Sequence, residues 1–482
     1  MTQPLCIHWF RQDLRLQDNP ALLAAARGGQ LLPIYILDDN SPGDWAMGAA
    51  SRLWLHHSLQ LLNQSLQGKL RLFRGDSQSI IESLVEEHSV DAVHWNRCYE
   101  PWRRQRDSAI KSMLKERAIE VESHNGSLLW EPWEVLKKDD TPYKVYTPYY
   151  RNGCLAIAPP RQAQAGPASL DLFPDSLPGS LTLDQLGLFE NLPWQQDLSR
   201  HCDAGETAAL GKLDEFCESA LESYRRGRDF PASQSTSMLS PHLHFGEISP
   251  QQVWHRIEQE QMRLHGDDPA HFKSELAWRE FSYYQIYHFP DLPDKPLKAQ
   301  YAKFAWREDA ANLALWQRGQ TGFPIIDAGM RELWQTGNMH NRVRMIVASF
   351  LVKNQLIHWR EGARWFWDCL FDADLASNSA GWQWCAGSGV DASPWFRIFN
   401  PVLQSEKFDP DGDYLRQYCP ELGALPNRYL HKPWLAPADV LQEASIEMGV
   451  DYPLPILDLK TTRLRALEAN KRLKAKPTSQ SN

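Results

Sequence analysis

The sequence predicts a two-part fold, with an α/β N-terminal doubly wound parallel sheet and a large all-helical C-terminal domain. Short apolar runs alternate with amphipathic segments over residues 1–130, which is typical of a parallel sheet with helices on its faces. Residues 131–205 are predicted to form an interdomain connection, because the composition there becomes rich in proline, alanine, serine and glycine. Helical periodicity dominates residues 206–475 and leaves a short tail at 476–482.

Five apolar runs in the first part are the predicted strands. They read LCIHWF, LLPIYIL, LRLFRG, DAVHWN and IEVESHN, and amphipathic segments such as residues 50–66 lie between them. A parallel sheet of this kind binds ligands at the carboxyl ends of its strands. No G-x-G-x-x-G follows the first strand and no P-loop motif occurs, so these motifs do not identify a ligand for this sheet.

The second part consists of periodic segments that predict helices, and Ser249 ahead of Pro250 is a typical helix start. The clearest of these segments span residues 208–227, 248–264, 272–289, 325–337 and 339–359.

Residues 376–401 have the composition of an exposed loop, because asparagine, serine and glycine are frequent there. Yet Trp382, Trp384 and Trp395 lie in the same stretch. An exposed loop would deprive these rings of the burial that tryptophan usually gains. We therefore expect something flat to cover them.

The composition indicates a soluble cytoplasmic protein. The eight cysteines show no metal-ligand spacing and suit free thiols in a reducing compartment, and neither a signal peptide nor a membrane-length apolar run is present. The net charge of −9 argues against a protein that coats nucleic acid through charge alone, although it allows a local basic patch. Most of the twenty tryptophans are expected to be packing residues.

Two predicted helix faces carry residues suited to chemistry, because positions three and four apart are neighbours on a helix. The alternative for either face, taken alone, is a solvated helix with salt bridges, but the surrounding segments look buried. The first face holds Glu275, Trp278, Arg279 and Ser282, and the second holds Asn341, Arg344, Met345 and Ala348, with His340 and Arg342 alongside.

Residues 235–250 supply hydroxyls and backbone amides ahead of a helix, which would suit phosphate oxygens. His242 and His244 lack a third ligand at a familiar spacing, and no H-E-x-x-H motif occurs, so we expect no metal. Basic residues interleave with tryptophans in the helical part, so the flat group over the rings could be a nucleic-acid base, whose stacking is worth roughly 1 to 3 kcal/mol. The basic residues are Arg279, Arg342, Arg344, Arg397 and Lys407.

Long motifs throughout the chain resemble the DNA photolyase/cryptochrome family, and within it the cyclobutane pyrimidine dimer photolyases. They include HWFRQDLRLQDNPAL, GRDFPASQSTSMLSPHLHFGEISP, WREF, TGFPIIDAGMRELWQTGNMHNRVRMIVASFLVK and SNSAGWQWCAGSGVDASPWFRIFNPVLQSEKFDPDGDY. SRLWLHHSL, WNRCYEPW and KVYTPYYR look most like the bacterial class III branch.

The resemblance implies an FAD in the helical domain, reduced in the active state. An antenna chromophore is also implied, and the class III likeness suggests methenyltetrahydrofolate. Its contacts do not carry over, because Trp102 and Arg103 stand where the folate-binding enterobacterial type has an Asn-Glu pair. The matched flavin contacts are Tyr224, Thr236, Ser237, Met238, Leu239, Ser240, Arg344, Asp372, Asp374 and Asn378, the last facing flavin N5.

The implied activity is light-driven electron transfer from the flavin to a flipped-out dimer in single- or double-stranded DNA, by a protein expected to be a monomer without membrane contact. By matched position, Glu275 and Asn341 bind the lesion, Met345 packs against it, and Trp278 and Trp384 form its walls. The implied DNA contacts are Arg279, Ser282, Arg342, Gln404 and Lys407, and the implied electron relay is Trp306, Trp359 and Trp382.

Two departures and two alternatives accompany this resemblance. Asn338 stands where many relatives carry tryptophan, and Phe272 stands where the enterobacterial enzymes carry tryptophan. A blue-light signalling cryptochrome is the main alternative, although Asn378 differs from the aspartate of the plant type. A (6-4) photolyase is the second, although His340 is followed by Asn341 where that branch has a second histidine.

Overall fold

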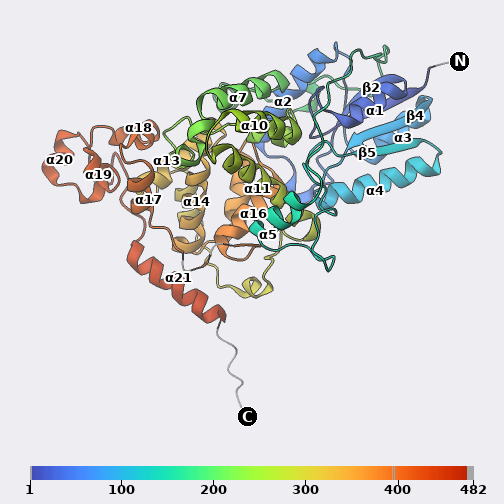
Figure 1. The fold of residues 1–482 in the computed structure, drawn as a ribbon. Coiled ribbons are helices and arrows are strands. Elements are labelled where there is room, and N and C mark those ends of the chain that lie inside the picture. The colour runs from blue at the N-terminus through green and yellow to red at the C-terminus, as the bar shows by residue number, and fades with distance from the viewer. Residues whose placement is uncertain (1–2, 393, 396, 475–482) are drawn as a thin grey trace. The chain divides into compact units, whose positions relative to one another are not determined.

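The computed structural model describes residues 3–392, 394–395 and 397–474 (Figure 1). A five-stranded parallel sheet in the order β3-β2-β1-β4-β5 confirms the predicted doubly wound sheet. Each of the five predicted runs overlaps one of its strands, and β2 and β4 each begin one residue before the predicted run. They are β1 (Leu5–Phe10), β2 (Gln30–Leu37), β3 (Arg71–Arg74), β4 (Val90–Asn96) and β5 (Glu120–His124).

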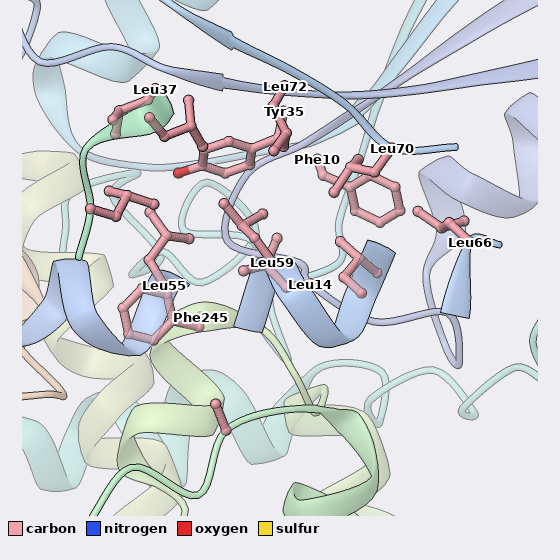
Figure 2. Close-up of a cluster of buried hydrophobic side chains, with 14 of the residues drawn as sticks. Phe10, Leu14, Tyr35, Leu37, Leu55, Leu59, Leu66, Leu70, Leu72 and Phe245 are labelled. Atoms are coloured by element: carbon pink, nitrogen blue, oxygen red, sulfur yellow. The ribbon is translucent and has the colours of Figure 1, made fainter. Parts of the chain in front are cut away.

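Helices cover both faces of the sheet, which explains why the central strands are apolar at nearly every position. Successive side chains of a strand point to opposite faces, so Phe10 and Trp9 of β1 belong to different cores. Figure 2 shows the first core, where Phe10 and Tyr35 share a cluster with Leu55 and Leu59. Helices α1 (Pro20–Gly28) and α2 (Ala49–Ser65) contribute to this core, and α3 (Ser77–Glu87) and α4 (Pro101–Glu116) to the other.

The chain divides into two compact units, each described here by itself. The first contains residues 1–225, 236–290 and 370–377, and the rest of the chain forms the second. The division into a sheet domain, a connection and a helical domain, which was predicted from composition and periodicity, stays a prediction. The predicted tail at 476–482 lies outside the described residues.

Helices dominate the chain from residue 206 onward, as predicted. Helix α10 (Pro250–Arg263) begins where expected, since Ser249 Oγ accepts the Gln252 N–H and Gln252 Oε1 accepts the Ser249 N–H. No helix within the described ranges is both long and apolar enough to cross a membrane. The other helices of the first unit are α5 (Tyr146–Pro148), α6 (Pro193–Ser199), α7 (Glu206–Ser219), α9 (Ser240–Phe245) and α11 (Asp268–His288).

The second unit is built from helices of moderate length, and two helices, α8 (Tyr224–Gly227) and α16 (Leu375–Ala386), pass from one unit to the other. Its own helices are α12 (Ala310–Gln317), α13 (Pro324–Thr336), α14 (Asn341–Ser349), α15 (Trp359–Cys369), α17 (Pro401–Phe408), α18 (Asp413–Tyr418), α19 (Asn427–Leu430), α20 (Ala438–Glu443) and α21 (Leu459–Lys474).

The loop-like interpretation of residues 376–401 was wrong for its first part, which lies in α16. Asp374 caps this helix by accepting the Ser377 N–H at 2.7 Å. Trp382 and Cys385 are buried, and this packing overrides the weak helix propensity of the asparagine, serine and glycine around them.

The single helix predicted over residues 339–359 was also wrong, because α14 ends at Ser349. A π-helical stretch, Phe350–Gln355, follows, and Leu356 then takes a left-handed conformation with φ of 60°. Inside this stretch Lys353 is buried and donates to the Arg397 carbonyl oxygen at 2.7 Å, a bond to another part of the chain.

Candidate functional site

Helix α11 brings an acid and an aromatic ring together on one face of the first unit. Glu275 and Trp278 are one turn apart and partly buried. The Trp278 ring stacks on Tyr146 at 3.7 Å with the planes 10° apart, and His271 Nε2 lies 3.9 Å from Glu275 Oε1. Sequence reasoning missed Tyr146, although it lies in the KVYTPYYR motif. One side of the Trp278 ring is therefore taken by another ring.

Arg279 and Ser282, predicted as DNA contacts on the same helix, are engaged inside the unit. Arg279 donates to the Ser127 carbonyl oxygen and to Glu280 Oε1, both at 3.0 Å, and its side chain is 14% exposed. Burial raises the pKa of Glu280 to about 7 in spite of the neighbouring guanidinium. The Ser282 hydroxyl donates to the Trp278 carbonyl oxygen at 3.0 Å. Neither side chain is poised toward solvent.

Part of the predicted flavin set also lies within the first unit. Ser240 begins α9, and its hydroxyl donates to Asp372 Oδ2 at 2.5 Å. The segment before it is irregular, with Met238 in a left-handed conformation at φ of 52°. Tyr224 is buried with its ring edge-on to Phe272 at 5.1 Å. Phe272 thus packs directly on a predicted flavin contact.

Asp374 is buried and holds its position through several hydrogen bonds. Burial alone would raise its pKa, but His244 at 3.5 Å, the Tyr283 hydroxyl and the Ser377 N–H favour the charged form and lower the pKa to about 2. The carboxylate therefore already accepts hydrogen bonds from groups of the protein. It fixes the start of α16, the helix that carries Asn378 and Trp382.

The start of α14 gathers the second predicted face within the second unit. Asn341 is its first residue and is exposed, and His340 Nδ1 caps the helix by accepting the Arg342 N–H at 3.2 Å. Burial, together with the nearby guanidinium groups of Arg344 and Arg342, lowers the pKa of His340 to about 4. Arg342 Nη1 lies 3.8 Å from Met345 Sδ. The Arg342 cation and the Met345 thioether therefore lie close together, on the helix that Asn341 begins.

The same unit brings two predicted phosphate contacts to one aromatic ring. Arg342 lies over the Phe408 ring at 4.5 Å, and Lys407 Nζ lies 4.9 Å from its centroid. Arg342 also pairs with Asp229 at 2.6 Å. Gln404 lies one turn before Lys407 on α17. Sequence reasoning missed Asp229 and Phe408, although both stand inside the quoted motifs.

Arg344, predicted as a flavin contact, lies on α14 beside this group. Its Nε donates to the Met339 carbonyl oxygen at 2.7 Å, and its Nη2 donates to Asn338 Oδ1 at 3.3 Å. Asn338 therefore helps to orient Arg344.

The predicted relay tryptophans also lie in the second unit. Trp306 is partly exposed, with its ring 5.2 Å from His358, whose ring is 5.5 Å from the buried Trp359. Trp382 packs on α15 at Gly362, one turn after Trp359, where a Cβ atom would lie 2.0 Å from the indole. These contacts form a route from a partly exposed ring to a buried one. His358 was missed because spacing alone gives it no role.

Trp382 and Trp384 are two positions apart on α16, so they point to different sides of the helix. Trp382 is 3% exposed, whereas Trp384 is partly exposed. On the same helix, Asn378 Nδ2 donates to the Ala363 carbonyl oxygen at 2.9 Å, which leaves its Oδ1 as the acceptor. The two tryptophans, which are close in the sequence, therefore differ in their surroundings in the fold.

His242 and His244 bind different carboxylates within the first unit. His242 Nδ1 lies 2.5 Å from Glu247 Oε2, and His244 Nδ1 lies 3.5 Å from Asp374 Oδ2. The two rings therefore do not act as a pair.

Two family models match the chain. One described as "DNA photolyase" matches residues 6–168, and one described as "FAD binding domain of DNA photolyase" matches residues 272–472.

Relatives match nearly the whole chain. It is 48% identical over 473 residues to the deoxyribodipyrimidine photo-lyase of Agrobacterium fabrum, covering 97% of this chain and 98% of that protein. It is 38% identical over 477 residues to Cryptochrome-2 of Arabidopsis thaliana, covering 95% and 77%. The crystal structure of a bacterial class III photolyase from Agrobacterium tumefaciens matches with a TM-score of 0.94 at 48% identity, covering 98% of each chain.

Proposed function

The chain belongs to the DNA photolyase/cryptochrome family, and on this premise we propose that it is a deoxyribodipyrimidine photo-lyase. This carbon–carbon lyase splits cyclobutane pyrimidine dimers in DNA under light. The observation that carries the proposal is the full-length likeness to a class III photolyase. The class III likeness of the short motifs supports the same assignment.

The family's cofactor is FAD, and the chemistry of the predicted contacts suits it. The Ser240 hydroxyl and Asp372 offer hydrogen bonds to a polar ligand, and Asn378 Oδ1 is an acceptor suited to the N5–H of a reduced flavin. When bound and reduced, FAD supplies the electron for dimer cleavage under light and takes it back. The proposed contacts are Tyr224, Thr236, Ser237, Met238, Leu239, Ser240, Arg344, Asp372, Asp374 and Asn378.

The lesion would be held by Glu275, Asn341, Met345, Trp278 and Trp384. A flipped dimer presents polar base edges and flat faces, which match a carboxyl group and an amide together with aromatic rings. Glu275 is 29% exposed, so it remains open to a ligand while being partly shielded from water. These residues would orient the bases and exclude water during electron transfer.

DNA phosphates would be held mainly by Arg342 and Lys407, with Gln404 beside them. With a net charge of −9, affinity must come from a local patch. Arg279 would have to leave Ser127 and Glu280 to contact a phosphate directly, so we rank it behind the other two cations.

Photoreduction of an oxidised flavin would use Trp306, Trp359 and Trp382. The partial exposure of Trp306 suits the surface end of the relay, and the burial of Trp382 suits the flavin end. An antenna chromophore of the methenyltetrahydrofolate type completes the proposed cofactors, and the absorption spectrum of the extracted protein tests it.

The proposed partner is damaged DNA, either single- or double-stranded. The protein is proposed to be a monomer and to act in the cytoplasm. The described cysteines are all free, and nearly all are buried, as suits a reducing compartment. A signalling cryptochrome is the second candidate, favoured by the likeness to a plant cryptochrome. Asn378 and the exposed Asn341 favour repair of the cyclobutane dimer instead.

Repair of a defined oligonucleotide tests the proposal. Photoreduced protein is mixed with DNA containing one thymine dimer and is kept in darkness or under near-ultraviolet light. We expect intact thymines to return only in the light, at a rate that falls sharply in Glu275→Ala. Equal repair in darkness, or none in the light with reduced FAD bound, would refute the proposed function. An oligonucleotide with a (6-4) lesion serves as the control substrate.

A further inference from the structure

His94, Glu122 and His124 form a group on the sheet that no part of the proposed repair reaction uses. In the parallel pairing of β4 with β5, His94 stands opposite Glu122. His124 lies two residues after Glu122 and so points to the same face of the sheet. One ligand atom from each of the three side chains lies within 4.8 Å of the others.

The distances within this group suit a tetrahedral ion. His124 Nε2 lies 3.5 Å from Glu122 Oε2. Two ligands on a tetrahedral metal with bonds of about 2.0–2.1 Å are roughly 3.4 Å apart. The His124 nitrogen and the Glu122 oxygen are therefore already near the separation that a tetrahedral ion requires. A small rotation of the side chains would bring all three ligand atoms into place.

Two nitrogens of the group are buried without a hydrogen-bond partner in the described part of the chain. They are His94 Nδ1 and His124 Nε2. A buried polar atom of this kind is costly unless a protein group, water or ion satisfies it. The centroids of the two rings are 5.8 Å apart and their planes are tilted by 33°, so both rings can offer a nitrogen to one ligand.

The surroundings also favour an ion. The nearby Arg97 is paired with Glu131 at 2.6 Å, and His8 Nε2 lies 3.5 Å from Asp13. The Glu122 side chain is 56% exposed, which gives an ion access from solvent.

We propose that His94, Glu122 and His124 bind one divalent transition-metal ion, with Zn²⁺ the best match and water as the fourth ligand. Two imidazoles and one carboxylate form a familiar zinc set that leaves one position open. The ion would tie the edge strand β5 to β4 and satisfy both orphaned nitrogens. This proposal replaces the expectation of no metal, which considered sequence spacing alone.

Calorimetric titration of the FAD-loaded protein with Zn²⁺ alone tests the site. We expect one equivalent to bind, and Glu122→Gln and His124→Gln each to weaken binding by about tenfold or more, since loss of even an indirect partner costs that much. Glu122 is exposed, so its variant should fold normally. His201→Ala, which removes an exposed histidine elsewhere, is the matched control and should bind as the wild type does. No binding, or equal affinity in all four proteins, would overturn the proposal.

X-ray absorption of the protein loaded with one equivalent of Zn²⁺ identifies the ligands independently. The proposed site predicts nitrogen and oxygen ligands at about 2.0–2.1 Å with an imidazole signature. Sulfur at about 2.3 Å would place the ion on cysteines and would contradict the assignment.

Discussion

Gly362→Ala is the substitution for which the structure makes its sharpest prediction. A Cβ atom at this position would lie 2.0 Å from Trp382 Cη2 and 2.4 Å from its Cζ3. Carbon atoms pack at about 3.5 Å, so the indole would have to retreat by about 1.5 Å. Gly381→Ala is the matched control, because it lies on the same helix as Trp382 and its Cβ would meet nothing within 4 Å.

The expected energies follow from packing and helix propensity. Alanine is favoured over glycine inside a helix by about 1 kcal/mol, which should stabilise Gly381→Ala. At Gly362 the same gain is opposed by overpacking, which costs about 1 to 3 kcal/mol. The free energy of unfolding should therefore differ between the two variants by about 1 to 3 kcal/mol, with Gly362→Ala the less stable.

The assay combines stability with photochemistry. Thermal melting and flavin content are measured first, and then the rate at which oxidised FAD is photoreduced. We expect photoreduction to slow in Gly362→Ala, where Trp382 has moved, and to stay unchanged in Gly381→Ala. If the two variants melt and photoreduce alike, the packing of Trp382 on α15 is not as described, and its relay role loses its structural support.

Further predictions concern the other predicted site residues. Trp382→Phe should block photoreduction of the flavin while leaving repair by chemically reduced protein nearly intact. Trp384→Ala should weaken lesion binding by about 1 to 3 kcal/mol and leave photoreduction unchanged. The opposite pattern would exchange the roles of the two tryptophans. Arg342→Ala should make the log–log salt slope of DNA binding shallower by about 0.9, and an unchanged slope would remove it from the phosphate contacts. His340 and Asp374 have pKa values lowered from 6.5 to about 4 and from 3.8 to about 2, so the folded protein binds fewer protons. The stability that each of these two groups contributes should therefore fall with pH, for His340 between 6.5 and 4 and for Asp374 below 3.8, whereas Glu280, with its pKa raised to about 7, acts in the opposite direction between pH 7 and 4.5. The melting temperature of His340→Gln should therefore fall less than that of the wild type between pH 6.5 and 4, and equal falls would contradict the His340 shift.

The sheet and the helix faces could be predicted because their signals are local. Each strand is a short apolar run, and residues such as Glu275 and Trp278 share a face through helical spacing alone. The start of α16 could not be predicted this way, since it depends on the buried Asp374 and on packing around Trp382. Composition pointed to a loop because it records propensity and carries no information on burial.

Pairing between distant segments explains the remaining differences. Arg279 stays a predicted DNA contact, and the sequence could not show that it is bonded to Ser127, which lies far away in the chain. The same holds for His94 and His124, which meet only through the register of two parallel strands. Sequence spacing shows which residues share an element, and only the fold shows which elements meet.

Repair without net redox change requires that the electron that opens the dimer returns to the flavin. A single-turnover flash experiment on the reduced protein, with thymine-dimer DNA in excess, measures both the thymines restored and the oxidation state of the flavin after each flash. We predict repaired DNA with the flavin spectrum back in its reduced form and no reductant consumed. Dimers that persist after the flash, or repair accompanied by a stoichiometric loss of reduced flavin, would contradict it.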